Sequence, residues 1–315
     1  MILPIYRPFQ GLCTTVTLGF LLGQAVPAPA QEAGIPSVVH PAQAPDSVDL
    51  HRRARKAQRD FESLHRRLLP MGEGRSGGSC DEYVGRLCLF DDDLWWEPPL
   101  EDSVLTFARD VLLESLAEIG RAIPGDRWVL AQRVRYLGDT GRWDAAKRLA
   151  AGCPSHLGWW CQGLGGYVLH RSGDVTGALE AFSLALESMG PERAGDWMDP
   201  HPIMEYAGGR WLRETSDLTR EEARARFWTL ADPLFLTPGN ERLSEHLARR
   251  FGFTLYDDSA LTMGMPWGRA FEQLLLRYGF IAGWEQIPEG IGAREIRNVV
   301  EHHHPESRGL LPPFQ

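Results

Sequence analysis

The chain lacks the sequence motifs by which many catalytic sites are recognised. Its 315 residues contain no H-E-x-x-H zinc motif and no G-x-S-x-G nucleophile elbow, and the glycine-rich residues 72–78 lack the spacing of a phosphate-binding loop. The chain also lacks an excess of positive charge, because 33 Lys and Arg stand against 42 Asp and Glu, a net charge of −9. These absences leave no catalytic motif and give no reason to expect nucleic acid as a partner.

Long apolar runs are missing except near the N-terminus. Arg7 precedes an apolar run from Leu12 to Val26, and Ala28-Pro29-Ala30 then forms an A-x-A cleavage site. This order predicts a signal peptide over residues 1–30, with cleavage before Gln31. A transmembrane anchor is the alternative, but the run is short for a bilayer and contains two glycines. We therefore expect an exported protein, periplasmic or extracellular, with no membrane span after signal removal.

Cysteine is scarce, with five in the chain, one of them in the predicted signal peptide. The other four are Cys80, Cys88, Cys153 and Cys161. An even number in an exported chain favours disulfides. Three pairings are possible, and we expect Cys80–Cys88 and Cys153–Cys161 because each closes a short loop. Four thiolates on zinc are the alternative, but zinc knuckles use a gap of about two to four residues, so we expect no metal and no cofactor.

The segment after the signal peptide changes character at residue 47. Residues 31–46 are rich in Pro and Ala without periodicity, which predicts a disordered linker. From Ser47 onward apolar residues recur at alternating steps of four and three, which predicts a helix. The other faces of this helix are rich in arginine. They indicate either a surface for membranes or nucleic acid, or a solvated helix face, and we favour the solvated face in an acidic exported chain.

A helical pattern that repeats once follows, between residues 102 and 191. Gly141 and Gly173 lie 32 residues apart, and each precedes a segment with a small residue at the same place, Ala146 and Ala178. The second unit follows the Gly, Ala, Phe, Ala, Pro order of the tetratricopeptide repeat, whose period is about 34 residues. The resemblance implies a short stack of antiparallel helical hairpins within residues 47–196, with the glycines in the turns.

The C-terminal third resembles a second family. The residues that carry the resemblance are Phe227, Trp228, Asp232, Pro233, Asn240, Glu241, Trp267, Tyr278 and Gly279. Their order resembles the GWxTD-domain family, found in exported bacterial proteins of unknown biochemical role. The chain departs from the family at the signature itself, since Arg269 and Ala270 stand in place of Thr-Asp. The resemblance implies a small α+β domain over residues 197–300, and we expect Trp267 to have a structural role there.

Local signals divide this C-terminal region further. Thr219 begins a capping box that opens a helix, and Thr237 followed by proline opens another. Two short apolar segments, Phe253–Tyr256 and Leu274–Tyr278, predict strands. We expect residues 301–315 to form an extended tail.

Three adjacent histidines, His302 to His304, are the most metal-like feature of the chain. Neighbouring histidines on a regular strand or helix cannot all face one ion, and structural sites use wider spacing. The alternatives are a metal site and a solvated tail, and we favour the tail.

Asp232, Glu241 and Glu245 are the acids nearest to one another in this region. Paired carboxylates can act as general acid and base, but a position before proline and a position in the first turn of a helix are also structural.

We therefore predict a mostly α protein, with a short tetratricopeptide-like helical-hairpin stack followed by a small α+β C-terminal domain. The favoured function is an exported, non-enzymatic scaffold that binds another protein in the bacterial envelope. Stacked hairpins present a groove and no chemistry. The alternative is a secreted or periplasmic hydrolase that acts on peptide or glycan through Asp232, Glu241 and Glu245.

Export predicts that the mature chain begins at Gln31. The intact mass of exported material should equal the mass of residues 31–315. Retention of residues 1–30 in that material would contradict both the export prediction and the disulfide argument that depends on it.

Overall fold

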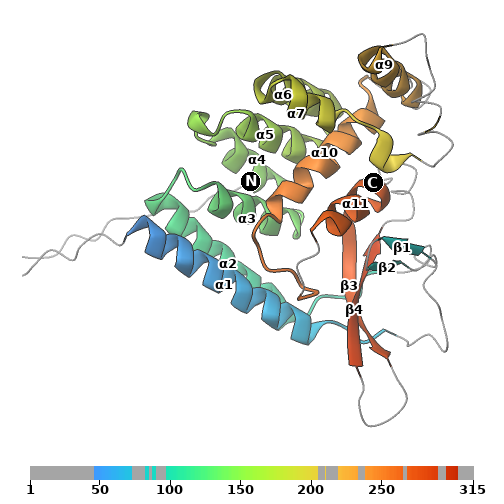
Figure 1. Cartoon of the computed structure of the whole chain (residues 1–315). Helices are drawn as coiled ribbons and strands as arrows, with labels where there is room; N and C mark the ends of the chain where they lie inside the picture. The colour runs from blue at the N-terminus through green and yellow to red at the C-terminus, as the bar shows by residue number, and fades with distance from the viewer. Residues whose placement is uncertain are drawn as a thin grey trace, which may run out of the picture. The chain divides into compact units, whose positions relative to one another are not determined.

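Helices dominate the computed structural model (Figure 1). It describes residues 46–72, 82–84, 87–89, 97–204, 210, 219–232, 238–264, 268–289 and 296–303. The predicted fold class, mostly α with a small strand-containing part at the C-terminus, is confirmed.

Helices α1 (Ser47–Leu68) and α2 (Ser103–Ala122) lie side by side and bury their facing sides (Figure 1). Asp46 and Asp102 cap them, each accepting a hydrogen bond from a backbone N–H of the first turn. The two helices are antiparallel: His51, near the start of α1, contacts Asp126, just beyond the end of α2, whereas Arg109 of α2 lies over Phe61, in the second half of α1.

Two helical hairpins follow: α3 (Arg127–Gly138) with α4 (Trp143–Ala151), and α5 (Trp159–Arg171) with α6 (Val175–Met189). Gly141 and Gly173 form the turns with φ of 66° and 87°, a conformation that favours glycine. Ala146 and Ala178 are fully buried where the helices approach. The predicted helical hairpins are therefore confirmed. A short turn η2 (Ser155–Leu157) joins the hairpins, and α7 (Pro191–Trp197) and η3 (His201–Ile203) follow α6.

A disulfide joins Cys153 and Cys161 across the short connection between the two hairpins, with the Cα atoms 5.7 Å apart. This pairing was predicted from the sequence and is confirmed. Cys80 lies outside the described residues, so the predicted Cys80–Cys88 pair stays a prediction. Cys88 is in strand β2 (Leu87–Leu89), which pairs with β1 (Glu82–Val84) in an antiparallel ribbon.

The C-terminal region contains α9 (Arg220–Ala231), α10 (Glu241–Leu255), α11 (Arg269–Tyr278) and the antiparallel pair β3 (Ile281–Glu289) and β4 (Ile296–His303). The predicted capping box at Thr219 is present, with Glu222 bonding back to the Thr219 backbone. Leu247, Ala248, Phe251 and Leu255 of α10 pack into the core of the hairpins. The hydrophobic core therefore crosses residue 197, where the sequence predicted a domain boundary.

The predicted strands Phe253–Tyr256 and Leu274–Tyr278 are wrong. Both segments are the C-terminal turns of helices, α10 ending at Leu255 and α11 at Tyr278. In α11, Phe271, Leu274, Leu275 and Tyr278 follow the i, i+3, i+4, i+7 spacing of a helix face. The prediction considered only the last few apolar residues of each helix, and a run that short does not distinguish a strand from a helix.

The predicted solvated tail is wrong at its beginning. His302 and His303 lie in β4, opposite Gly283 and Ile281 of β3, and both side chains are buried. Nδ1 of His303 is 3.1 Å from the Gly279 carbonyl oxygen, and Nε2 of His302 is 3.2 Å from a carboxylate oxygen of Glu285. Pairing with β3 is what converts this polar segment into a strand. His304 and the residues after it lie outside the described residues.

The close contact between α5 and α6 gives a test of this packing. A Cβ added at Gly166 would lie 2.7 Å from the Phe182 ring, whereas one added at the adjacent Gly165 meets nothing within 4 Å. Gly166→Ala should therefore destabilise the protein by about 1–3 kcal/mol through overpacking. Gly165→Ala should be neutral or stabilise it by up to about 1 kcal/mol through helix propensity. Urea unfolding measures both, and equal effects would contradict the described contact.

Candidate functional site

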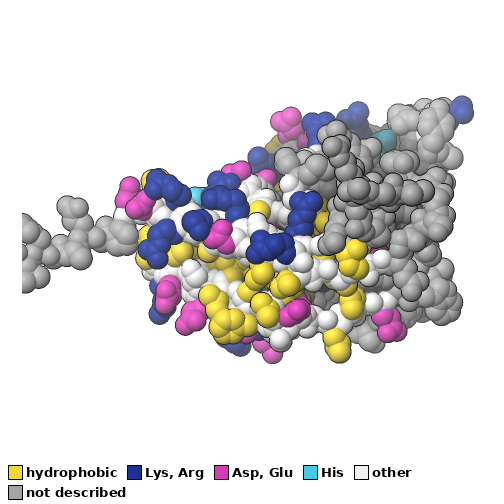
Figure 2. Space-filling view, turned by 90° about the horizontal axis from the view of Figure 1, so that it is seen from below, with side chains coloured by type: hydrophobic (Ala, Val, Ile, Leu, Met, Phe, Trp, Pro, Cys, Tyr) yellow, Lys and Arg dark blue, Asp and Glu magenta, His cyan; other side chains and the backbone are white. Residues whose placement is uncertain are grey.

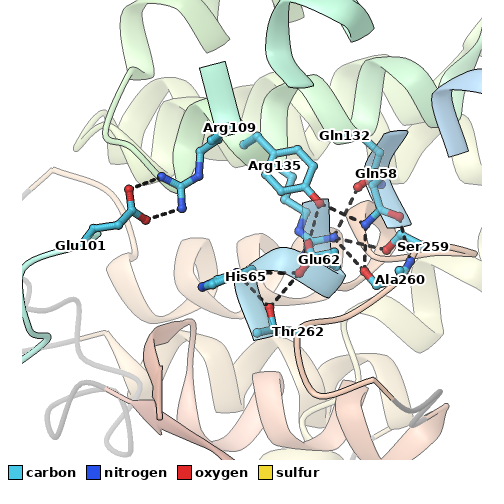
Figure 3. Close-up of polar contacts among 11 residues, drawn as sticks. Gln58, Glu62, His65, Glu101, Arg109, Gln132, Arg135, Ser259, Ala260 and Thr262 are labelled. Carbon is cyan, nitrogen blue, oxygen red and sulfur yellow. Dashed lines mark hydrogen bonds and ion pairs between the residues drawn. The ribbon is translucent and has the colours of Figure 1, made fainter. Parts of the chain in front are cut away.

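A buried polar network joins α1, α3 and the segment after α10 (Figure 3). Its centre is Glu62, whose side chain is 2% exposed. Oε1 of Glu62 accepts hydrogen bonds from Arg135 Nη2 at 2.6 Å and from the Tyr136 hydroxyl at 2.5 Å. Oε2 accepts one from the Thr262 hydroxyl at 2.8 Å. Burial alone would raise the pKa of Glu62, but the Arg135 guanidinium and the hydrogen bonds outweigh it and hold the pKa at about 2.

Gln58 connects the loop that contains Ala260 to the same network through hydrogen bonds. The Gln58 amide donates to the Tyr136 hydroxyl at 3.0 Å and to the Ala260 carbonyl at 2.9 Å, and its oxygen accepts from the Ala260 N–H at 3.0 Å (Figure 3). Arg135 stacks over the ring of Tyr256, 4.4 Å from its centroid. The network therefore connects α1 to residues about 200 positions later in the chain, and it holds the loop that leads from α10 to α11.

A pocket of about 520 Å³ lies beside this network. A second ion pair lines it, in which the Arg109 guanidinium meets both oxygens of Glu101, a residue just before α2. Leu100, Asp139 and Trp284 also line it. Both guanidiniums are already bound to carboxylates. Thr262 and His65 also line the pocket, with the Thr262 hydroxyl 3.2 Å from Nδ1 of His65. Among the described residues, no group of three or more His, Cys, Asp and Glu side chains could hold a metal ion.

A second buried array involves Glu245, one of the predicted candidate acids. The Ser244 hydroxyl is 2.8 Å from Nδ1 of His170, and Nε2 of His170 is 2.5 Å from Glu245 Oε2. Arg249 donates to the other oxygen of Glu245 at 2.6 Å. Burial would raise the pKa of Glu245, but Arg249 and His170 lower it well below the usual range of a carboxylate. The sequence analysis missed His170 and Ser244, because they are 74 residues apart and match no motif.

The order hydroxyl, imidazole, carboxylate is that of a serine-hydrolase triad. The surroundings of these three groups, however, are not those of an active site. Ser244 has no exposed surface, and it does not line the 520 Å³ pocket. Both oxygens of Glu245 are bound, and in the described part of the chain no hydrogen bond or ion pair joins it to Asp232 or Glu241. The array connects α5 to α10 inside the core, which is a structural role.

The other two predicted acids stand at helix ends. Asp232 is the residue that follows α9, and Glu241 is in the first turn of α10. One buried oxygen of each side chain lacks a hydrogen-bond partner within the described residues. The structure therefore does not bring Asp232, Glu241 and Glu245 together around one cavity that it describes.

The residues that carry the GWxTD resemblance have packing and capping contacts. Trp228 is buried, its ring meets Phe227 edge-on, and its indole N–H donates to the Met198 carbonyl at 2.9 Å. Asn240 caps α10 by accepting from the Leu243 N–H, and it donates to the Trp228 carbonyl at 2.6 Å. Tyr278 is buried, and Gly279 ends α11 with φ of 83°. Pro233 and Trp267 lie outside the described residues.

An exposed apolar surface lies along α2. We call it the α2 stripe; its members, with their exposed fractions, are Val104 (53%), Phe107 (71%) and Val111 (50%). Their spacing of three and four residues places them on one side of α2. Figure 2 shows hydrophobic side chains gathered on this face beside a row of Lys and Arg side chains. The opposite side of α2 is buried through Leu105, Leu112 and Leu116, so the helix is apolar on both sides.

Comparison of the chain with protein-family models, with curated proteins and with solved structures gives no match. The resemblances to the tetratricopeptide repeat and to the GWxTD family therefore stay predictions. Of the helices in the described residues, none combines the length and the apolar character that crossing a membrane requires.

The Glu62 network gives a pH-dependent prediction. Glu62→Gln leaves the Arg135 charge buried without its partner and should cost about 3–5 kcal/mol at neutral pH. The folded-state pKa of about 2 lies below the ordinary value of 4.5. Wild type therefore has this stabilisation above pH 4.5 and loses it as the pH falls from 4.5 through 2.

Urea unfolding of both proteins at neutral pH and at about pH 3 measures the effect, and the difference between them should shrink in acid. Glu180→Gln, at an exposed position of α6, is the control and should match wild type at both pH values. A difference between wild type and Glu62→Gln that is independent of pH would contradict the ionised network.

Proposed function

We propose that the protein is a non-enzymatic scaffold that binds another protein through the α2 stripe, and that it acts after export in the bacterial envelope. The observation that carries the proposal is the exposure of Phe107 and its apolar neighbours on a helix whose opposite side is already buried. A surface helix of a globular protein normally has one apolar side. A second apolar side, contiguous and bordered by charge, marks a surface that a partner covers.

The hairpin architecture supports the same function. Packed helices present extended surfaces, and their side chains supply recognition rather than chemistry. A hydrolase acting on peptide or glycan through Asp232, Glu241 and Glu245 is the alternative, but no contact among these three acids within the described residues favours it. Its best-placed acid, Glu245, is bound on both oxygens and buried.

Export is supported by two observations. The N-terminal sequence has the order of a signal peptide, and the Cys153–Cys161 disulfide is of a kind that persists in oxidising compartments. The bacterial envelope as the place of action comes from the GWxTD resemblance and belongs to the proposal.

Site-specific photo-crosslinking in the producing cells tests the proposal. A photoreactive aromatic amino acid at Phe107 should give a covalent adduct with a second polypeptide. The same amino acid at Leu184 of α6 or Leu230 of α9, two other exposed apolar positions, should not. Adducts of equal yield at all three positions, or none at Phe107, would contradict a binding role for the stripe.

The matched loss-of-function variant is Phe107→Ser. Because the side chain is exposed, its thermal stability should change by no more than about 0.5 kcal/mol, while adduct formation from a probe at Val104 should fall. Leu184→Ser is the control for removing an exposed apolar side chain elsewhere.

A further inference from the structure

The 520 Å³ pocket beside the Glu62 network contains more negative than positive charge. Its described lining includes four carboxyl groups and two guanidiniums, and each guanidinium is already paired with one of the carboxylates. The other two carboxyl groups belong to Asp102 and Asp139. The negative charges stay in excess even when His65, which also lines the pocket, is protonated.

Asp102 and Asp139 differ in their partners. Asp102 caps α2 and accepts a hydrogen bond from the Val104 N–H at 2.8 Å. Asp139 is exposed and lines the pocket, and within the described residues its carboxylate has no hydrogen bond or ion pair. Its capacity to bind a positive group is therefore not used within the described part of the fold.

The position of Asp139 in the chain is unfavourable for an acid. It follows Gly138, the last residue of α3, and the partial negative charge of a helix C-terminus repels a carboxylate. The second hairpin provides a comparison. Arg171 stands two residues before Gly173, as Asp139 stands two residues before Gly141, and the positive charge of Arg171 suits the end of α5. The hairpin turn itself therefore does not require an acid at this place.

The surroundings of Asp139 add to this cost. Neighbouring protein takes water away from the carboxyl group and raises its pKa, and the Arg135 and Arg109 guanidiniums oppose this rise without reversing it. A cation bound beside Asp139 would favour the ionised form and offset the loss of water. A carboxyl group with a raised pKa in a cavity is a typical feature of a binding site.

The remainder of the pocket suits an apolar molecule. A volume of about 520 Å³ lies within the range of pockets that hold small organic ligands. The aromatic ring of Trp284 can also attract a cation. The apolar lining comes from the end of α1, from the segment before α2 and from β3, and includes Leu68, Leu69, Pro98, Leu100, Ile281 and Trp284.

Other classes of ligand match the pocket less well. An anion would find neither guanidinium free, because Arg109 binds both oxygens of Glu101 and Arg135 binds Glu62, and it would be repelled by Asp139. For a metal ion, the described residues provide no group of three or more His, Cys, Asp and Glu side chains that could hold it.

We propose that this pocket binds a small organic molecule that carries an ammonium group on an apolar body, with Asp139 as the counter-ion of the ammonium group. The inference is independent of the proposed function, because it concerns a cavity and needs no second polypeptide. Capture of a partner through Phe107 and binding of an amine in the pocket can therefore each be present without the other.

Isothermal titration calorimetry at neutral pH with 2-phenylethylamine and hexylamine tests the proposal. Each amine is compared with its uncharged counterpart, 2-phenylethanol or hexanol, and phenylacetate serves as the anionic counterpart. The amines should bind about tenfold or more tightly than the alcohols, because only they pair with a carboxylate, and phenylacetate should not bind. Equal binding of amines and alcohols, or no saturable binding of either amine at millimolar concentration, would overturn the proposal.

Asp139→Asn removes the charge and keeps the size of the side chain. It should weaken binding of the amines by about tenfold or more and leave binding of the alcohols unchanged. Its melting temperature should equal or exceed that of wild type, because the repulsion at the end of α3 is removed. Glu180→Gln, at an exposed position of α6, is the control and should match wild type in both measurements.

Two outcomes for Asp139→Asn would overturn the proposal. Unchanged affinity for the amines would show that Asp139 is not their counter-ion. A lower melting temperature would show that the fold itself requires the acid, which removes the reason for assigning Asp139 to a ligand.

Filling the pocket provides a test that leaves every charge in place. Ala282 of β3 is exposed and lines the pocket, so Ala282→Phe should abolish binding of the amines while Ala282→Ser keeps it. Thermal unfolding confirms that both variants are folded. Undiminished binding to folded Ala282→Phe would place the amine outside this pocket and overturn the proposal.

Discussion

The ion pair between Glu62 and Arg135 is the interaction on which the arrangement of the helices depends. Both charges are buried and bound to each other at 2.6 Å. A buried charge is costly unless it is paired and its remaining hydrogen-bonding capacity is satisfied. Glu62 meets that condition only when α1, Tyr136 of α3 and Thr262 stand together. The pair therefore admits one arrangement of these segments, whatever its net contribution to stability.

The position of α2 follows from that arrangement. Its buried side packs on α1 and α3 through leucines and through Arg109, which lies over Phe61 of α1. Helix α1 is in turn held from its other side by Gln58 and Glu62. The outward side of α2 is left to solvent, and there Val104, Phe107 and Val111 are exposed. The buried side of α2 therefore holds the helix in the fold, and its exposed side is open to solvent.

Much of the helical fold could be predicted from the sequence, because its signals are local. Periodicity, the glycine turns and the short Cys153–Cys161 loop each lie within a few residues of the structure they specify. The strands predicted at Phe253 and Leu274 were wrong because the ends of two helices were considered without the turns before them. The Glu62 network could not be predicted, because Glu62 and Thr262 are 200 residues apart. Nothing in the sequence of either segment indicates a contact with the other.

The exposed surface of α2 and the polar groups of the interior differ in their capacity to bind a partner. Interior polar groups, such as Glu62 and Glu245, are already paired, so their binding capacity is used within the fold. The stripe is held on a helix that is packed from behind, so its side chains need little further ordering when a partner covers them. Association through this surface then depends on apolar contact with Val104, Phe107 and Val111 for its affinity.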